Sequence, residues 1–137
     1  MVIVTMFYTS CPLACPVTLA KLREIESALK KDVRSELAVV LITMDPAGDT
    51  PGVLRAFRKA QRLPLNWSLL RGPSESTHEV ATRLGITFEK EGFRLVHSNE
   101  IVLVDGKGRI ISRLSGLHTS PEALLQAATQ SLRPPGS

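Results

Sequence analysis

Apolar residues follow two kinds of pattern along this chain of 137 residues. Val2–Tyr8 is a continuous apolar and β-branched run, which is typical of a strand covered on both faces of a sheet. Leu37–Met44 is a second run of this kind, and Trp67–Leu70 is a shorter one. The first half of the chain therefore contains three predicted strands.

Between these strands, apolar residues recur every three or four positions, which predicts amphipathic helices. The first helix is expected over residues 16–31, with Pro16 in its first turn. Thr50 is a suitable N-cap for a second helix, which would run to about residue 62. A third helix is predicted over Ser76–Leu84, where a glycine stops it.

The second half of the chain has the pattern of antiparallel strands. Ile86–Val96 predicts one hairpin, and a second joins Glu100–Val104 to Arg109–Ser115 through the turn Asp-Gly-Lys-Gly. Ser120 then caps a final helix that reaches about Leu132.

This order of elements predicts the fold class. Early βαβ crossovers require parallel strands and the late hairpins add antiparallel ones, so we expect a mixed α/β sheet with helices on both faces. That arrangement is thioredoxin-like. We expect one domain over residues 1–132 and a frayed tail over residues 133–137.

Charge and hydropathy exclude some functions. The chain has seventeen basic and thirteen acidic residues. The basic residues are dispersed along the sequence and only six aromatic residues accompany them, so nucleic-acid binding is not predicted. No apolar run reaches the roughly 18 residues of a membrane span, and the first residues lack the features of a signal peptide. A start on a core strand is explained either by an upstream hairpin or tether absent from this chain, or by a natural start at Met1.

Both cysteines of the chain, Cys11 and Cys15, lie in the stretch FYTSCPLACP. Cys11 belongs to the loop after the first strand, at the carboxyl end of the sheet where open α/β folds bind ligands. Cys15 falls at the amino end of the next helix, where free N–H groups and the helix dipole lower the pKa of a thiol. In a helical turn the two Cα atoms would lie ~6 Å apart, which suits either a disulfide or two sulfurs on one metal.

Several uses of such a pair fit poorly. A c-type haem site needs C-x-x-C-H, a structural zinc site needs further ligand pairs, and a thioredoxin catalyst has two residues between its cysteines, not three. A peroxidase is disfavoured because Tyr8, not a hydroxyl residue of the Ser or Thr type, lies three residues before Cys11. Cu(I) is satisfied by two thiolates and one imidazole, so a copper site and a redox pair both remain open.

The third ligand of a copper site would be a histidine. His78 lies on the solvent side of a predicted helix and reads as a surface residue, and His118 reads as a loop residue before the last helix. His97 is expected in a loop at the edge of the sheet, between two strand-like segments. Position alone favours His97 over the other two without deciding its role.

Three motifs in order resemble the Sco/SenC family. They are Y-T-S-C-P-x-x-C-P at Tyr8–Pro16, D-P-x-x-D-T-P at Asp45–Pro51, and L-V-H-S-x-x-I-V-L-V-D-x-x-G at Leu95–Gly108. The resemblance implies a thioredoxin-like copper chaperone for assembly of cytochrome c oxidase, with Cys11, Cys15 and His97 as ligands of one copper ion, Cu(I) or Cu(II). The implied partner is the copper-bearing subunit of the oxidase, which has a binuclear copper site, or another copper chaperone.

The resemblance also implies a periplasmic or other cell-envelope location, with an upstream membrane tether that this chain lacks. It allows a second activity, in which Cys11 and Cys15 act as a thiol–disulfide oxidoreductase pair that reduces cysteines of an oxidase subunit. A thioredoxin catalyst has a proline facing its cysteines, but no proline occurs between Pro73 and Pro121, which favours metal binding. Asp45 and Asp49 are interpreted as turn and helix-cap residues, with a role near the metal as the alternative.

Overall fold

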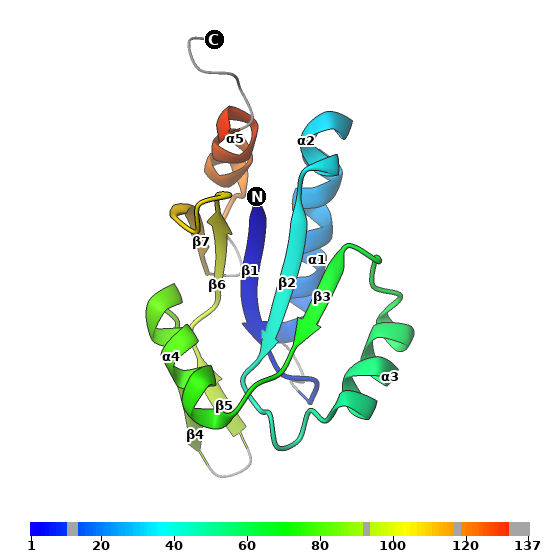
Figure 1. Ribbon diagram of the computed structural model, residues 1–137, viewed down its shortest axis with the longest axis vertical. Coiled ribbons are helices and arrows are strands. Elements are labelled where there is room, and N and C mark those ends of the chain that lie inside the picture. The colour runs from blue at the N-terminus through cyan, green and yellow to red at the C-terminus, as the bar shows by residue number, and fades with distance from the viewer. Residues whose placement is uncertain (11–13, 92–93, 117–118, 132–137) are drawn as a thin grey trace.

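The computed structural model describes residues 1–10, 14–91, 94–116 and 119–131 (Figure 1). The main sheet has the strand order β3-β2-β1-β6-β7, and β4 and β5 form a separate pair. The strands are β1 Val2–Phe7, β2 Ala38–Thr43, β3 Trp67–Leu70, β4 Phe88–Glu91, β5 Arg94–His97, β6 Glu100–Val104 and β7 Ile110–Ser115. Strands β1, β2 and β3 are parallel, whereas β6 is antiparallel to β1 and β7 is antiparallel to β6. The predicted mixed sheet is therefore confirmed.

The helices are α1 Ala14–Ala28, α2 Lys31–Ser35, α3 Pro51–Gln61, α4 Ser74–Leu84 and α5 Glu122–Ser131. The predicted extension of the first helix to residue 31 is wrong, because the extended backbone of Lys30 separates α1 from α2. Leu29 and Val33 are both buried in the same core cluster, so the apolar spacing continues across the break and conceals it. The expected tail, residues 133–137, lies outside the described residues.

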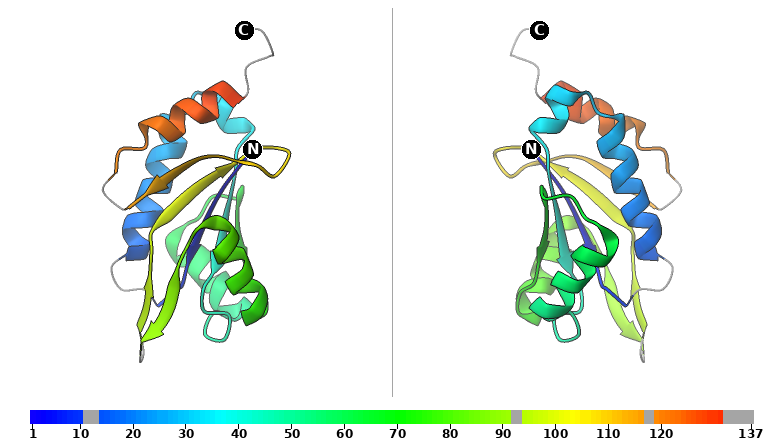
Figure 2. Two further views of the ribbon diagram at one scale, coloured as in Figure 1. Left: turned by 90° about the vertical axis from the view of Figure 1, so that its left-hand side faces the viewer. Right: turned by 90° about the vertical axis from the view of Figure 1, so that its right-hand side faces the viewer.

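The side chains of each central strand point alternately to the two faces of the sheet. Ile3 and Phe7 of β1 pack in a cluster with residues of α1 and α5, whereas Met6 packs in a second cluster with residues of α4. Figure 2 shows α1 and α5 on one side of the sheet and α4 on the other. Helices on both faces, as predicted, bury both sides of the sheet.

Helix α3 begins as its sequence predicts. The hydroxyl of Thr50 accepts a hydrogen bond from the N–H of Val53 at 3.3 Å, and Pro51 is the first helical residue. Its Leu54 belongs to the cluster that α1 covers, and Figure 1 shows α3 beside edge strand β3. The aspartate-proline loop, residues 45–51, is thereby held between the end of β2 and the start of α3.

The turn between β6 and β7 is built around Asp105. Its carboxylate accepts hydrogen bonds from the N–H groups of Lys107 and Arg109, each at 2.9 Å, and from Nε of Arg109 at 3.0 Å. The backbone N–H of Arg109 is the largest of the effects that lower the pKa of Asp105 below its ordinary value of 3.8. The predicted hairpin is confirmed, with a bulge at Leu103/Val104.

The parallel strands all end at the lower side of the sheet in Figure 1. The aspartate-proline loop, the start of α3 and the β4–β5 pair lie at that same end (Figure 1). Among the described residues, no helix combines the length and apolar character that crossing a bilayer requires.

Candidate functional site

The cysteine segment leaves the sheet at the end of β1 and enters α1. Tyr8 is buried, and Thr9 and Ser10 form the last described turn before residues 11–13, which include Cys11 and lie outside the described residues. Cys15 is the second residue of α1, as predicted, although its side chain is also outside the described part. Its backbone position puts it in the first turn of the helix.

Asp49 anchors this segment to the neighbouring strand. Its carboxylate accepts hydrogen bonds from the N–H of Thr9 at 3.1 Å and from the Thr9 hydroxyl. It also accepts one from the hydroxyl of Thr43, the last residue of β2, at 2.6 Å. Both oxygens of the carboxylate are thus engaged, and the carboxylate ties the backbone two residues before Cys11 to the end of β2.

The prediction that Asp49 is a turn and helix-cap residue is only half right, because its N–H closes the turn onto the carbonyl of Asp45 at 2.8 Å but its side chain does not cap α3. The cap of α3 comes from Thr50, and Asp49 is only 2% exposed because it points back into the protein. The same prediction is confirmed for Asp45, whose carboxylate accepts a hydrogen bond from the N–H of Gly48 at 3.2 Å. Sequence patterns could not separate the two aspartates because both lie in one polar loop.

His97 is the last residue of β5, where it pairs with Phe88 of β4. The expectation that it lies in a loop is wrong, because the β4–β5 pair continues one residue further than the apolar pattern indicates. Its side chain lies outside the described part of the chain. The structure does define the backbone position of His97 at the end of β5.

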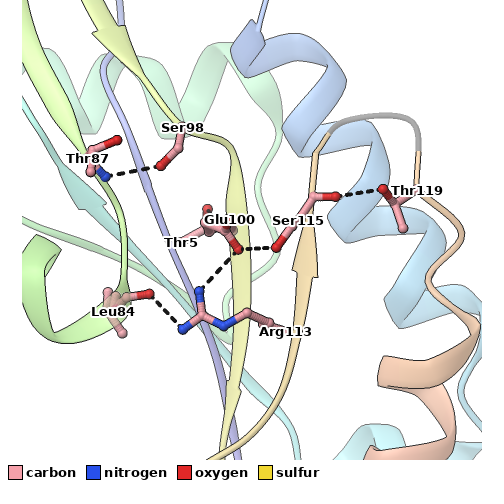
Figure 3. A network of polar contacts seen from close by, with 8 residues as sticks. All are labelled: Thr5, Leu84, Thr87, Ser98, Glu100, Arg113, Ser115 and Thr119. Carbon is pink, nitrogen blue, oxygen red and sulfur yellow. Dashed lines mark hydrogen bonds and ion pairs between the residues drawn. The ribbon is translucent and has the colours of Figure 1, made fainter.

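The three residues after His97 are hydrogen-bonded to three different segments, which are the residue before β4, the residue after β7, and β1. Ser98 donates its N–H to the carbonyl of Thr87 at 2.9 Å, and its hydroxyl accepts the N–H of Thr87 at 3.1 Å (Figure 3). The carbonyl of Asn99 accepts the N–H of Gly116 at 2.8 Å. The carbonyl of Glu100 accepts the hydroxyl of Thr5, in β1, at 2.7 Å.

The side chain of Glu100 extends this attachment into a network, drawn in Figure 3. Its carboxylate accepts Nη1 of Arg113 at 3.2 Å and the hydroxyl of Ser115 at 2.7 Å. Arg113 also donates to the carbonyl of Leu84 at the end of α4, at 3.0 Å. Gly85 fits this contact because its φ is +73° and a Cβ there would lie 2.9 Å from Nη1 of Arg113. The network joins β6, β7 and α4 just beyond His97.

Sequence reasoning missed this network, although a signal for it exists. Counting outward from the four-residue Asp-Gly-Lys-Gly turn would place Arg113 directly opposite Glu100, whereas the observed register, which includes a bulge at Leu103/Val104, pairs Glu100 with Ser115 and Val102 with Arg113. Arg113 is two residues from Ser115 and therefore on the same face of the sheet, so its charge near Glu100 could have been expected.

Strand register brings the two ends of the predicted site together. β6 is antiparallel to β1, with Thr5 opposite Ile101, so β6 begins where β1 ends. The backbone leading back to His97 therefore meets the same end of the sheet as the backbone leading on to Cys11. Among the described side chains, no group of three or more His, Cys, Asp and Glu could hold a metal ion. The predicted ligand set of Cys11, Cys15 and His97 falls outside that test.

A cleft of about 240 Å³ adjoins the cysteine segment. Its walls include Ser10 of that segment, Asp45 of the aspartate-proline loop, His78 of α4 and Phe88 of β4. The His78 ring stacks on Phe88 with centroids 4.6 Å apart, and its Nδ1 donates to the carbonyl of Ser74 at 2.9 Å. His78 is exposed, as predicted, but it also lines this cleft; His118 lies outside the described residues.

Known proteins of one family are similar to this chain in sequence. A family model described as SCO1/SenC matches residues 1–133. A candidate copper-binding protein from Stutzerimonas stutzeri is 34% identical over 108 residues, which are 75% of this chain and 52% of that protein. A SCO2-like protein from Rickettsia felis is 29% identical over 124 residues, 87% of this chain and 60% of that protein. The chain thus spans between half and three-fifths of the length of these curated relatives.

Solved structures share the fold. Copper-bound ScoI of Bradyrhizobium japonicum has a TM-score of 0.75 and 25% identity, over 96% of this chain and 84% of that one. Copper-bound yeast Sco1 has a TM-score of 0.78 and 22% identity, over 98% of this chain and 78% of that one. A candidate electron transfer protein from Aquifex aeolicus VF5 has a TM-score of 0.83 and 21% identity, over 96% and 78%. The predicted thioredoxin-like arrangement is confirmed by these likenesses.

Proposed function

Because this chain belongs to the SCO1/SenC family, we propose that it is a copper metallochaperone that holds one copper ion with Cys11, Cys15 and His97. The ion is cargo, which the chain delivers to the binuclear copper site of a cytochrome c oxidase subunit or exchanges with another copper chaperone. The domain that does this spans residues 1–132 and works at the periplasmic or cell-envelope face of a membrane.

The observation that carries this proposal is the meeting of two backbone segments at one end of the sheet. Cys15 lies in the first turn of α1, and His97 ends a strand three residues before Glu100, beside the end of β1. Two thiolates and an imidazole are a donor set that suits Cu(I), and the imidazole adds a nitrogen ligand for Cu(II). Two structurally similar proteins, ScoI of Bradyrhizobium japonicum and yeast Sco1, have copper bound in their solved structures, which supports copper as the cargo.

The residues around the site position it and leave it accessible. Asp49 holds the backbone at Thr9, and the Ser98 and Glu100 contacts hold the backbone after His97. The adjoining cleft keeps one side of the cysteine segment open to an incoming ligand. A partner group can therefore reach the metal before the ligands of this chain leave, which ligand exchange requires.

His97→Ala is expected to weaken Cu(II) binding by at least about tenfold while weakening Cu(I) binding much less, because two thiolates remain for the softer ion. Both affinities are measured by competition with a chelator on the reduced protein. Glu79→Ala is the control, since Glu79 is exposed, lies outside the proposed ligand set and does not line the adjoining cleft, so it should change neither affinity. An unchanged Cu(II) affinity in the His97 variant would remove His97 from the site.

Glu100→Ala is expected to lower Cu(II) affinity about tenfold, as loss of groups that orient a ligand does, with less effect on Cu(I). The side chains of Glu100 and Arg113 are 14% and 38% exposed, so the ion pair itself should contribute less than about 1 kcal/mol to stability. Glu100→Gln, which keeps an acceptor for Ser115, should restore most of the Cu(II) affinity. Glu79→Ala, which removes a surface ion pair of α4, is the control and should leave both copper affinities unchanged. Equal losses for the two ions in Glu100→Ala would mean that the network only stabilises the fold.

A thiol–disulfide oxidoreductase is the second candidate, favoured by the position of Cys15 in the first turn of α1. In that reaction the Cys11–Cys15 dithiol becomes a disulfide, and its two electrons and two protons reduce a disulfide of the partner to two thiols. Fast exchange with a disulfide peptide, together with weak copper binding, would favour the oxidoreductase. Tight, transferable copper with slow exchange would favour the chaperone.

A further inference from the structure

A cleft of about 270 Å³ beside α3 is lined by three arginine side chains and by no acidic residue. The arginines are Arg55 and Arg58 of α3 and Arg71, just after β3. Leu54 and Leu69 are among the apolar residues that complete its walls. The cleft is separate from the one beside the cysteine segment, and the proposed copper site does not use it.

Two of these guanidinium groups are held in place by backbone carbonyls. Arg58 donates from Nη1 to the carbonyl of Pro64 at 3.1 Å and from Nη2 to the carbonyl of Trp67. Arg71 donates from Nε to the carbonyl of Pro46 at 2.8 Å, which leaves its two Nη groups without a hydrogen bond among the described residues. Binding an anion between groups that are already ordered loses little conformational entropy.

The arginines that line this cleft have no ion-pair partner among the described residues. Helix α3 contains no acidic residue, and Lys59 and Arg62 add two further positive charges near its end. Planar guanidinium groups bind carboxylates through paired hydrogen bonds, so an acidic side chain is the complementary occupant.

The cleft adjoins the loop that supports the proposed copper site. The Arg71 contact to Pro46 lies in the aspartate-proline loop, and Pro51, which lines the cleft, follows Asp49 by two residues. Helix α3 begins at the end of the sheet where β1 and β2 end (Figure 1). A protein bound in the cleft would therefore lie next to the cysteine segment.

We infer that this arginine cleft is the docking site for an acidic segment of the protein that exchanges copper with this chain, an inference that rests on the proposed function. The apolar walls suit a carboxylate carried on a protein segment with neighbouring aliphatic groups. A phosphate ion would use the guanidinium groups alone. Docking there holds the partner's ligands beside the cysteine segment during ligand exchange.

The test uses a capped hexaglutamate peptide as the probe, with binding measured by calorimetry on the whole chain. Arg55→Gln with Arg71→Gln should weaken peptide binding at least about tenfold, because two charged contacts are lost. Lys31→Gln with Arg34→Gln removes the same charge from exposed positions of α2, and it should weaken binding by no more than about twofold. Equal weakening in both variants, or no peptide binding by the unmodified chain, would overturn the inference. So would stronger binding of inorganic phosphate or of vesicles containing anionic lipid.

Copper titration of the same proteins separates this inference from the proposed function. Copper affinity should stay within about twofold in the arginine double variant, since the cleft supplies no metal ligand. If the unmodified chain fails to bind copper, the proposed function fails even where peptide binding is normal. The single variant Arg55→Gln tests the cleft without disturbing the fold, because Arg55 makes no hydrogen bond among the described residues. Unchanged peptide binding in this variant would show that the proposed docking site is wrong.

Discussion

Cys15→Ser is expected to abolish tight binding of both Cu(I) and Cu(II). A serine hydroxyl is a hard, neutral ligand at pH 7, so the substitution removes one of the two soft donors and leaves the helix N-terminus intact. Loss of groups that merely orient a ligand lowers metal affinity 10- to 100-fold, so loss of the ligand itself should lower Cu(I) affinity by at least about 100-fold. Competition with a chromogenic Cu(I) chelator measures this change.

The control for this variant is Val17→Ala. Val17 lies in the same part of α1, two residues beyond Cys15, and is 39% exposed, so truncating it should leave copper affinity unchanged. Far-UV circular dichroism of both variants checks that α1 is retained. A Cys15→Ser protein that binds Cu(I) as tightly as the unmodified chain would show that the copper site lies elsewhere. The same substitution also stops disulfide exchange, so the His97 variant, not this one, separates the two candidate functions.

Asp49→Ala is expected to lower the free energy of unfolding by about 3 kcal/mol, because it leaves buried donors without their acceptor. Thr43 is completely buried, and its hydroxyl would lose the carboxylate at 2.6 Å. The N–H and hydroxyl of Thr9 would lose the same partner, which releases the backbone before Cys11. Urea denaturation measures the stability, and copper affinity should fall as well because the cysteine segment is less well ordered.

Asp49→Asn tests whether shape or charge is needed. The amide keeps an acceptor oxygen for Thr43, so its effect on stability should be about 1 kcal/mol, well below that of alanine. Asp32→Asn, at an exposed position of α2, should change stability by less than about 0.5 kcal/mol. If Asp49→Ala proves as mild as Asp32→Asn, the carboxylate does not anchor the cysteine segment.

Periodicity in the sequence predicted most elements because each buries a face whose apolar spacing is local. The β1 and β2 runs, the Thr50 cap of α3 and the glycine stop of α4 are all properties of neighbouring residues, and the structure confirms them. The same logic failed at Lys30, where an apolar spacing that continues from Leu29 to Val33 hides a break between helices. Apolar periodicity indicates which positions are buried, but it does not indicate the backbone conformation of the residues between them.

For the proposed site, the sequence alone determined which candidate donor atoms the chain contains, namely two thiols four residues apart at a predicted helix start and the imidazole of His97 in a motif that resembles a family's. Only the tertiary structure decided what supports them. The contacts of Asp49 with Thr9, and of Glu100 with Arg113, join residues that are 40 and 13 positions apart. Strand register, with Thr5 opposite Ile101, placed the end of β1 beside the start of β6. These relations depend on long-range pairing and on which way a buried side chain points, and no local pattern of residues encodes either.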